Sequence, residues 1–301
     1  MAQREDIQIA SHGGILDAWM YPAIGVQRNE QSPVIILAQG LGGTKDMRLF
    51  EYCERFSAAG FVCVVFDYRY WGKSTGQPRG LVDVEAQLAD WNTVIDYAAK
   101  LPQVDPERIG IFGSSFCGGH VIRLAATNPK VKATVSQCPF TDGFASTCAI
   151  GLAPLPKLAW LALRDVFWST QANPVRVPLL GDPGEAALMS TEECKPGYQR
   201  LLPPGMTQLE IDAVPARLIL HMPFLYPGAY AKSVPTPIYF AICGRDTVTP
   251  PDASLKFVKL APKGTIEIYK ESNHFDIYVG QLFERAIADY IAFFKKNLAA
   301  N

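Results

Sequence analysis

Short, continuous apolar runs constrain the fold of this chain more than any other feature of its sequence. The clearest runs are Val34–Gln39 (VIILAQ), Phe61–Phe66 (FVCVVF) and Ile238–Cys243 (IYFAIC), each of strand length and almost without polar alternation. Segments with helical spacing of their apolar residues, such as Val84–Lys100, lie between such runs. A strand that is apolar on both faces is typical of a parallel sheet covered by helices on both sides. The sequence therefore predicts an α/β architecture.

The same patterns place the other elements of the sheet and its helices. The expected strands are Ile15–Tyr21, Val34–Gln39, Phe61–Phe66, Arg108–Phe112, Val131–Cys138, Ile238–Cys243 and Thr265–Tyr269. The expected helices are Asp46–Ala59, Val84–Lys100, Cys117–Ala126, Pro251–Leu260 and Phe275–Leu298.

The regular alternation stops between Thr141 and Val234. This stretch is rich in proline, and only Leu158–Trp168 and Arg217–Tyr226 have helical patterns in it. A structureless loop of that length is improbable inside a domain. We therefore expect residues 141–234 to form a mostly helical cap, inserted into a core made of residues 1–140 and 235–301.

The composition argues against several functional classes. Hydrophobic residues make up 49% and charged residues 19% of the 301 residues, which is typical of a globular protein with a large core. The net charge of −1 gives no basic surface of the kind that binds nucleic acid. No run approaches the roughly 18 apolar residues of a membrane span, and the start MAQREDIQIASHGG lacks the apolar region of a secretory signal. We expect neither a nucleic-acid nor a membrane partner.

Cysteines and histidines do not follow a metal-binding pattern. The seven cysteines are odd in number and include no Cys-x-x-Cys pair, and the four histidines are scattered along the chain. A zinc site normally shows such pairs. We therefore expect no metal and a reducing, cytoplasmic setting.

A serine flanked by small residues follows the strand Arg108–Phe112. The sequence there is Gly113-Ser114-Ser115-Phe116-Cys117-Gly118-Gly119, and a helix is expected to follow it. A serine on a sharp strand-to-helix turn has its hydroxyl lifted above the sheet edge, and the crowded turn needs small neighbours. The usual pattern is Gly-x-Ser-x-Gly; here Cys117 takes the place of the second glycine. Ser115 is the expected nucleophile, while Ser114 and the Cys117 thiol are the alternatives.

An acid and a histidine follow in the chain order that this arrangement requires. Asp246 lies in the loop after the strand Ile238–Cys243, and His274 follows the strand Thr265–Tyr269. A serine hydroxyl needs a base to take its proton, and a carboxylate fixes the ring tautomer of that base. We expect Ser115, Asp246 and His274 to form a catalytic triad. Asp142, which follows the strand Val131–Cys138, is the competing acid.

Further residues are expected to complete the site. The oxyanion of an acyl-transfer reaction needs N–H donors, and the N–H groups of Phe116 and of Leu41, in the glycine-rich loop after Val34–Gln39, are the candidates. Three residues are candidates for contact with the substrate, namely Trp71, Cys138 and Tyr226.

Several segments together resemble one branch of the α/β-hydrolase superfamily. They are GLGGTKDMRLFEYCERFSAAGFVCVVFDYRYWGKSTGQPR, RIGIFGSSFCGGHV, SQCPFTDG, PLLGDPGEAALMS, GRDTVTP and SNHFDIY, and they span nearly the whole chain. The branch includes dienelactone-hydrolase-like proteins and fungal polyketide transferases. The resemblance implies a cytosolic enzyme without a metal or organic cofactor, with Ser115, Asp246 and His274 as its triad.

Together these observations predict an α/β-hydrolase fold, with a mostly parallel eight-stranded sheet, flanking helices and an inserted helical cap. We expect a hydrolase that cleaves an ester or thioester of a bulky, hydrophobic acyl or polyketide substrate through an acyl-serine. Acyl transfer or carbon–carbon condensation by the same triad is the alternative, and a non-catalytic binding scaffold is a third reading that an intact triad disfavours. A carrier-protein thioester is one expected form of the substrate, and a homodimer is one expected state of the protein.

Overall fold

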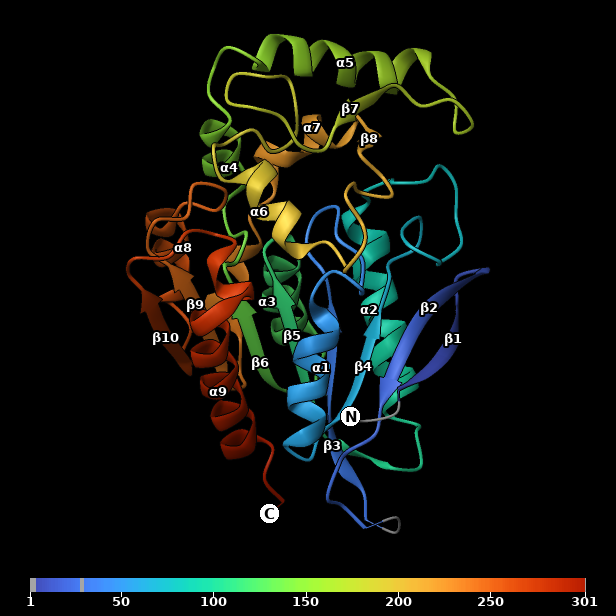
Figure 1. Ribbon diagram of the computed structural model, residues 1–301, viewed down its shortest axis with the longest axis vertical. Helices are drawn as coiled ribbons and strands as arrows, with labels where there is room; N and C mark the ends of the chain where they lie inside the picture. Colours follow the sequence, from blue (N-terminus) through green and yellow to red (C-terminus); the bar gives the residue numbers. More distant parts are fainter. Residues whose placement is uncertain (1–3, 28–29, 301) are drawn as a thin grey trace.

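An eight-stranded sheet runs through the centre of the computed structural model, which describes residues 4–27 and 30–300 (Figure 1). The strand order is β1-β2-β4-β3-β5-β6-β9-β10. The strands are β1 (Glu5–Ser11), β2 (Gly14–Tyr21), β3 (Ser32–Ala38), β4 (Val62–Phe66), β5 (Val104–Ser114), β6 (Val131–Gln137), β9 (Ile238–Cys243) and β10 (Gly264–Tyr269). β2 is antiparallel to β1 and β4, and the other neighbours are parallel. The expected mostly parallel eight-stranded sheet is confirmed.

Helices cover both faces of this sheet. α1 (Leu49–Ala58) and α9 (Gly280–Asn297) share one face, where Arg55 and Glu284 form an ion pair between them. α2 (Val84–Ala98) and α3 (Phe116–Thr127) share the other face, with α8 (Pro251–Val258) farther along the sheet. Every residue of β4 and β9 is buried. Their continuous apolar sequences follow from this burial on two sides.

The segment between β6 and β9 lies over the end of the sheet to which β5 and β6 point (Figure 1). Its helices are α4 (Gly143–Ala149), α5 (Leu155–Trp168), α6 (Cys194–Leu201) and α7 (Leu218–His221), with short 3-10 turns at Met222–Phe224 and Pro227–Ser233. It also contains β7 (Arg176–Pro178) and β8 (Ala213–Pro215), which pair antiparallel. Since loops after parallel strands gather at the carboxyl edge of the sheet, the space under this segment is where a site is expected.

The structure differs from the sequence expectations at several places. The inserted segment holds a two-stranded sheet besides its helices, and strands of three residues that contain proline show no alternation to detect. α1 begins at Leu49 rather than Asp46, because Arg48 has φ 70°, outside the helical region. The last helix begins at Gly280, after a 3-10 turn at Asp276–Tyr278, instead of at Phe275. β1, with only two isoleucines in a polar sequence, was not expected as a strand.

No helix within the described part of the chain is long and apolar enough to cross a membrane.

Candidate active site

Ser115 lies on a sharp turn between β5 and α3. Its backbone has φ 58° and ψ −123°, a conformation that residues with a Cβ seldom adopt. The turn is crowded: a Cβ on Gly113 would lie 2.5 Å from the Cys117 carbonyl oxygen, and one on Gly40 would lie 2.8 Å from the Ser115 Cβ. Glycine is therefore required at both places, and the strain holds the Ser115 hydroxyl above the sheet edge.

Ser115, His274 and Asp246 form a continuous chain of hydrogen-bonded side chains. Ser115 Oγ lies 3.0 Å from His274 Nε2, and His274 Nδ1 lies 2.6 Å from Asp246 Oδ2. With the Nδ1 proton donated to the carboxylate, Nε2 keeps its lone pair and can accept the proton of Ser115. Three loops that are far apart in sequence thus meet at one edge of the sheet.

Asp246 is held in place by its own loop. The backbone N–H groups of Val248 and Thr249 donate to Oδ1 at 2.8 and 2.7 Å, and the Thr249 hydroxyl donates to Oδ2 at 2.8 Å. These bonds fix the orientation of the carboxylate, so that Oδ2 faces the imidazole of His274.

The electrostatic surroundings of His274 favour its protonated form. Burial lowers the pKa of His274, but the charge and hydrogen bond of Asp246, together with the charge of Glu193, outweigh it and hold the pKa above its ordinary value of 6.5. The imidazolium that forms when Ser115 loses its proton is therefore stabilised within the buried site.

The alternative residues are engaged elsewhere. The Ser114 hydroxyl is fully buried and hydrogen-bonds the Tyr278 hydroxyl at 2.5 Å, and Asp142 caps α4 by accepting from the Ala145 N–H at 3.0 Å. The Cys117 thiol accepts from the Tyr68 hydroxyl at 3.0 Å, and burial raises its pKa to about 12. A thiol with such a pKa is not a nucleophile at neutral pH.

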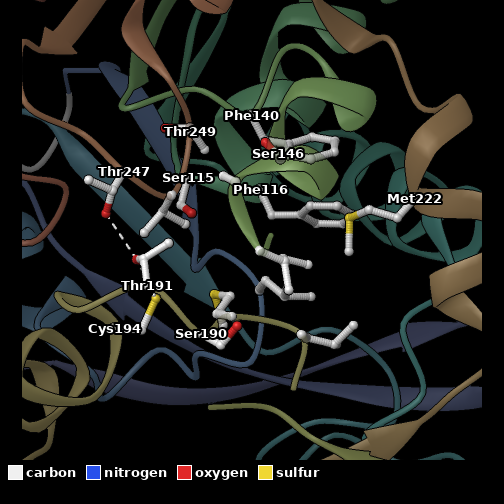
Figure 2. A pocket seen from close by; sticks show the side chains of 16 residues that line it. Ser115, Phe116, Phe140, Ser146, Ser190, Thr191, Cys194, Met222, Thr247 and Thr249 are labelled. Carbon is white, nitrogen blue, oxygen red and sulfur yellow. Dashed lines mark hydrogen bonds between the residues drawn. The ribbon is translucent and has the colours of Figure 1, made fainter. Parts of the chain in front are cut away.

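A cavity of about 40 Å³ opens in front of the Ser115 hydroxyl (Figure 2). Most of its lining is apolar and comes from α4 and from the loop before α6 as well as from the core. Its apolar lining residues include Leu41, Phe116, Phe140, Ala149, Ile150, Leu188, Met189, Met222 and Val248, and its polar ones are Ser115, Ser146, Ser190, Thr191, Cys194, Thr247 and Thr249.

The two candidate oxyanion donors line this same cavity. Phe116 is the first residue of α3, where backbone N–H groups have no partner inside the helix and the helix dipole is positive. Leu41 lies in the loop after β3, and the Tyr198 hydroxyl of α6 donates to its carbonyl oxygen. The structure therefore places both residues beside Ser115.

The three residues expected to contact substrate do not line the cavity of Ser115. Trp71 is buried and donates its indole N–H to the Leu81 carbonyl at 3.0 Å. Cys138 is buried, with its sulfur 3.1 Å from the Cys243 sulfur and 3.7 Å from the His274 carbonyl oxygen. Tyr226 lines a separate cavity of about 190 Å³, which shares only Phe116 and Phe140 with the first.

A known family of hydrolases matches the part of the chain that carries the serine turn. The family described as X-Pro dipeptidyl-peptidase (S15 family) matches residues 17–182, more than half of the chain. The matched part contains the serine turn and the loop after β3. The chain belongs to the S15-like α/β-hydrolases. It is therefore an enzyme of the ester- and thioester-hydrolase type.

Relatives of this hydrolase come from bacteria and fungi. The quorum-quenching protein AidA of Acinetobacter baumannii (strain MDR-ZJ06) is 42% identical, over 97% of this chain and 94% of that protein. Thiohydrolase aneE of Aspergillus aculeatus (strain ATCC 16872 / CBS 172.66 / WB 5094) is 25% identical, over 89% of this chain and 86% of that protein. Polyketide transferase ATR5 of Stachybotrys chlorohalonatus (strain IBT 40285) is 25% identical, over 98% of each chain.

The resemblance to fungal polyketide transferases is thus real but distant, and AidA matches this hydrolase at much higher identity. A solved structure of DcsB in complex with its substrate analogue has a TM-score of 0.83 at 22% identity, and the match covers 99% of this chain and 100% of that one. At that identity the likeness shows the shared fold alone.

Glu193, which the sequence patterns did not single out, joins the inserted segment to the triad loops of the hydrolase. One carboxylate oxygen accepts from the His274 backbone N–H at 2.7 Å, and the other accepts from the Thr247 N–H at 2.7 Å. Glu193 directly precedes α6, in the segment with the least regular sequence pattern. Only its position in the folded chain reveals its contact with both loops.

One group of side chains has the atom types of a metal site. Cys138, Asp246 and His274 offer ligand atoms that all lie within 4.8 Å of one another. Burial, followed by the neighbouring Cys243, raises the pKa of Cys138 well above its ordinary value, and Asp246 is already hydrogen-bonded to His274. Because metal ligands must be deprotonated, this group fits a proton relay better than a metal site.

Proposed function

We propose that this hydrolase cleaves an ester or thioester of an apolar acyl group through an acyl-enzyme at Ser115. One observation carries the proposal: the hydrogen-bonded chain from Asp246 through His274 ends at a serine hydroxyl that faces an apolar cavity. A strained serine turn with a base and an orienting acid is the arrangement that nucleophilic acyl transfer requires.

In the first half of the proposed reaction, Ser115 attacks the acyl carbonyl carbon. His274 Nε2 takes the Ser115 proton as the new carbon–oxygen bond forms, and the Asp246 carboxylate stabilises the resulting imidazolium. The carbonyl oxygen becomes an oxyanion, which the N–H groups of Leu41 and Phe116 receive. Collapse of this intermediate breaks the bond to the leaving oxygen or sulfur, to which His274 returns the proton.

The second half of the proposed reaction releases the acid. Water gives a proton to His274 Nε2 and attacks the acyl carbon, and the same two N–H groups receive the oxyanion. The intermediate then releases the carboxylic acid and restores the Ser115 hydroxyl. An alcohol, thiol or carbon nucleophile in place of water would give transfer or condensation, which is the alternative for this site.

The cavity narrows the class of acyl group. Its mainly apolar walls suit an acyl group that is largely hydrocarbon. The 42% identity to a protein named for quorum quenching, over 97% of the chain, favours a quorum signal with an ester bond as the natural substrate. The thiohydrolases, at 25% identity, favour a thioester less strongly.

The proposal is tested with p-nitrophenyl esters of increasing chain length, with acyl thioesters, and with quorum signals whose loss a reporter strain detects. We expect turnover by the native protein, an acyl adduct on Ser115 by mass spectrometry, and a loss of about 10⁶-fold in kcat for Ser115→Ala. Ser114→Ala is the matched control, since its hydroxyl is buried away from the cavity. A Ser115→Ala protein that retains turnover would rule out the acyl-serine mechanism.

A further inference from the structure

The Ser190 hydroxyl is a polar group without a partner in the wall of the active-site cavity. Ser190 is 3% exposed, and its Oγ has no hydrogen-bond partner among the described residues. Figure 2 shows it among the side chains that line the cavity in front of Ser115. A buried hydroxyl without a partner lowers stability, and a ligand group that hydrogen-bonds it would remove that cost.

Three of the other hydroxyls that line this cavity are already engaged. Thr247 and Thr191 form a hydrogen bond of 2.9 Å between their hydroxyls, and the Thr249 hydroxyl donates to Asp246. The neighbours that precede Ser190, Leu188 and Met189, are apolar and face the same cavity. Ser190 is therefore a free polar contact within an otherwise apolar stretch of the wall.

The backbone before Ser190 is fixed. The Leu188 N–H donates to the Pro178 carbonyl at 3.0 Å, and the Met189 N–H donates to the Leu179 carbonyl at 3.0 Å. These bonds hold the loop against β7 and keep Ser190 in the cavity wall. The cavity is therefore the side from which a partner for its hydroxyl is expected.

We infer that Ser190 is a specificity residue, which hydrogen-bonds a polar substituent on the acyl chain of the substrate. A serine hydroxyl both donates and accepts, so the matching substituents are a keto oxygen, a hydroxyl or an amide. The substrate class is thus an ester or thioester whose acyl chain is apolar except for one such group. This inference rests on the proposed acyl-ester function of the same cavity.

The physical basis is the cost of an unpaired buried hydroxyl. A plain hydrocarbon chain in the cavity leaves Ser190 Oγ unpaired, as it is among the described residues, whereas a substituted chain supplies a partner. A site built to hydrogen-bond its substrate therefore rejects the analogue that lacks the group. Ser190 would discriminate between acyl chains of equal length.

The test uses N-acetylcysteamine thioesters of one chain length, either plain or with a hydroxyl or keto group placed at successive carbons. For one of the substituted thioesters we expect the native protein to have a kcat/KM about tenfold above that of the plain one. Ser190→Ala is expected to lower kcat/KM for that substrate about tenfold and to change it much less for the plain thioester, which makes no hydrogen bond to Ser190.

Thr134→Val is the matched control for this experiment. Thr134 Oγ1 is also buried without a hydrogen-bond partner among the described residues, but it belongs to β6 and does not line the cavity. Both substitutions remove an unpaired hydroxyl, so both are expected to keep or raise Tm. Only Ser190→Ala is expected to change the ratio of kcat/KM between substituted and plain thioesters.

Two results would overturn the inference. One is a Ser190→Ala protein that loses the same factor on plain and substituted thioesters, and the other is a protein whose ratio is unchanged for every position of the substituent. Failure of the proposed function is distinguishable from both, because the native protein would then turn over no thioester or ester faster than Ser115→Ala does.

Discussion

Neighbouring residues of the same type have different environments in this hydrolase. Ser114 and Ser115 are adjacent, yet one hydroxyl is enclosed between Tyr278 and Gln137 while the other faces the cavity. Asp142 and Asp246 both follow strands of the sheet, but only Asp246 meets His274. The chemistry that a side chain can perform here depends on the direction that the turn gives it.

The acid assignment leads to a direct prediction. Asp246→Asn is expected to lower kcat about 10³–10⁴-fold, because an amide no longer fixes the Nδ1–H tautomer of His274. Asp142→Asn is the control, and its effect is expected to be confined to the stability of α4, which Asp142 caps. Steady-state kinetics with a p-nitrophenyl ester compares the two. A larger loss for Asp142→Asn would transfer the role of acid to that residue.

At the scale of elements, one buried ion pair anchors the loop between β3 and α1. Lys45 Nζ bonds Asp17 of β2 and lies 2.6 Å from Asp67 Oδ2, in the loop after β4; the Lys45 N–H also donates to Asp67 at 2.7 Å. Burial alone would lower the pKa of Lys45, but both carboxylates offset this and hold it above its ordinary value. Leu41, the candidate oxyanion donor, belongs to the same loop.

Removing this cation tests the role of the loop. Lys45→Met is expected to lower the free energy of unfolding by about 3–5 kcal/mol, since it leaves the buried Asp67 without its counter-charge. A reduced kcat is expected as well, because Leu41 loses its fixed position. Lys73→Met, at an exposed lysine nearby, is expected to change stability by less than about 0.5 kcal/mol. Urea unfolding measures the free energy of unfolding of both variants. Equal losses in Lys45→Met and Lys73→Met would contradict the proposed role of Lys45 in anchoring the loop.

At the scale of the whole molecule, the inserted segment takes part in the site as well as covering it. It supplies α4, Leu188, Met189 and Ser190 to the cavity wall, and Tyr198 of α6 holds the Leu41 carbonyl. Glu193 joins it to the loops of Asp246 and His274. A movement of this segment would therefore alter both the shape of the cavity and the electrostatics of His274.

The pH dependence of kcat/KM tests whether Glu193 of the inserted segment raises the pKa of His274. His274 must be neutral to act as a base; since its pKa lies above 6.5 in the folded protein, activity is expected to fall as the pH decreases through a midpoint above 6.5. Glu193→Gln keeps the shape but removes a charge that raises this pKa, so its midpoint is expected at lower pH. The exposed neighbour Glu192 gives the control, Glu192→Gln, whose midpoint should match that of the native protein. A midpoint for Glu193→Gln at or above the native one would contradict this account.

Much of this protein follows from local sequence alone. Strands β3, β4 and β9 are buried on both faces, and a run such as FVCVVF records that burial directly. The serine turn needs small residues at fixed positions, because a Cβ at Gly113 would collide with the backbone. The fold, the serine turn and the end of β9, after which Asp246 follows, were predictable for these reasons.

The cavity in front of Ser115 was decided only by the tertiary structure. The inserted segment has strands of three residues and short helices, so its sequence carries little periodicity to interpret. Trp71 and Tyr226 were reasonable substrate contacts by position, yet the Trp71 indole is hydrogen-bonded to the Leu81 carbonyl and Tyr226 lines a separate cavity. The place of Ser190 in the cavity wall, and the hydrogen bonds of Glu193 to the loops of Asp246 and His274, exist only once the inserted segment has packed on the sheet.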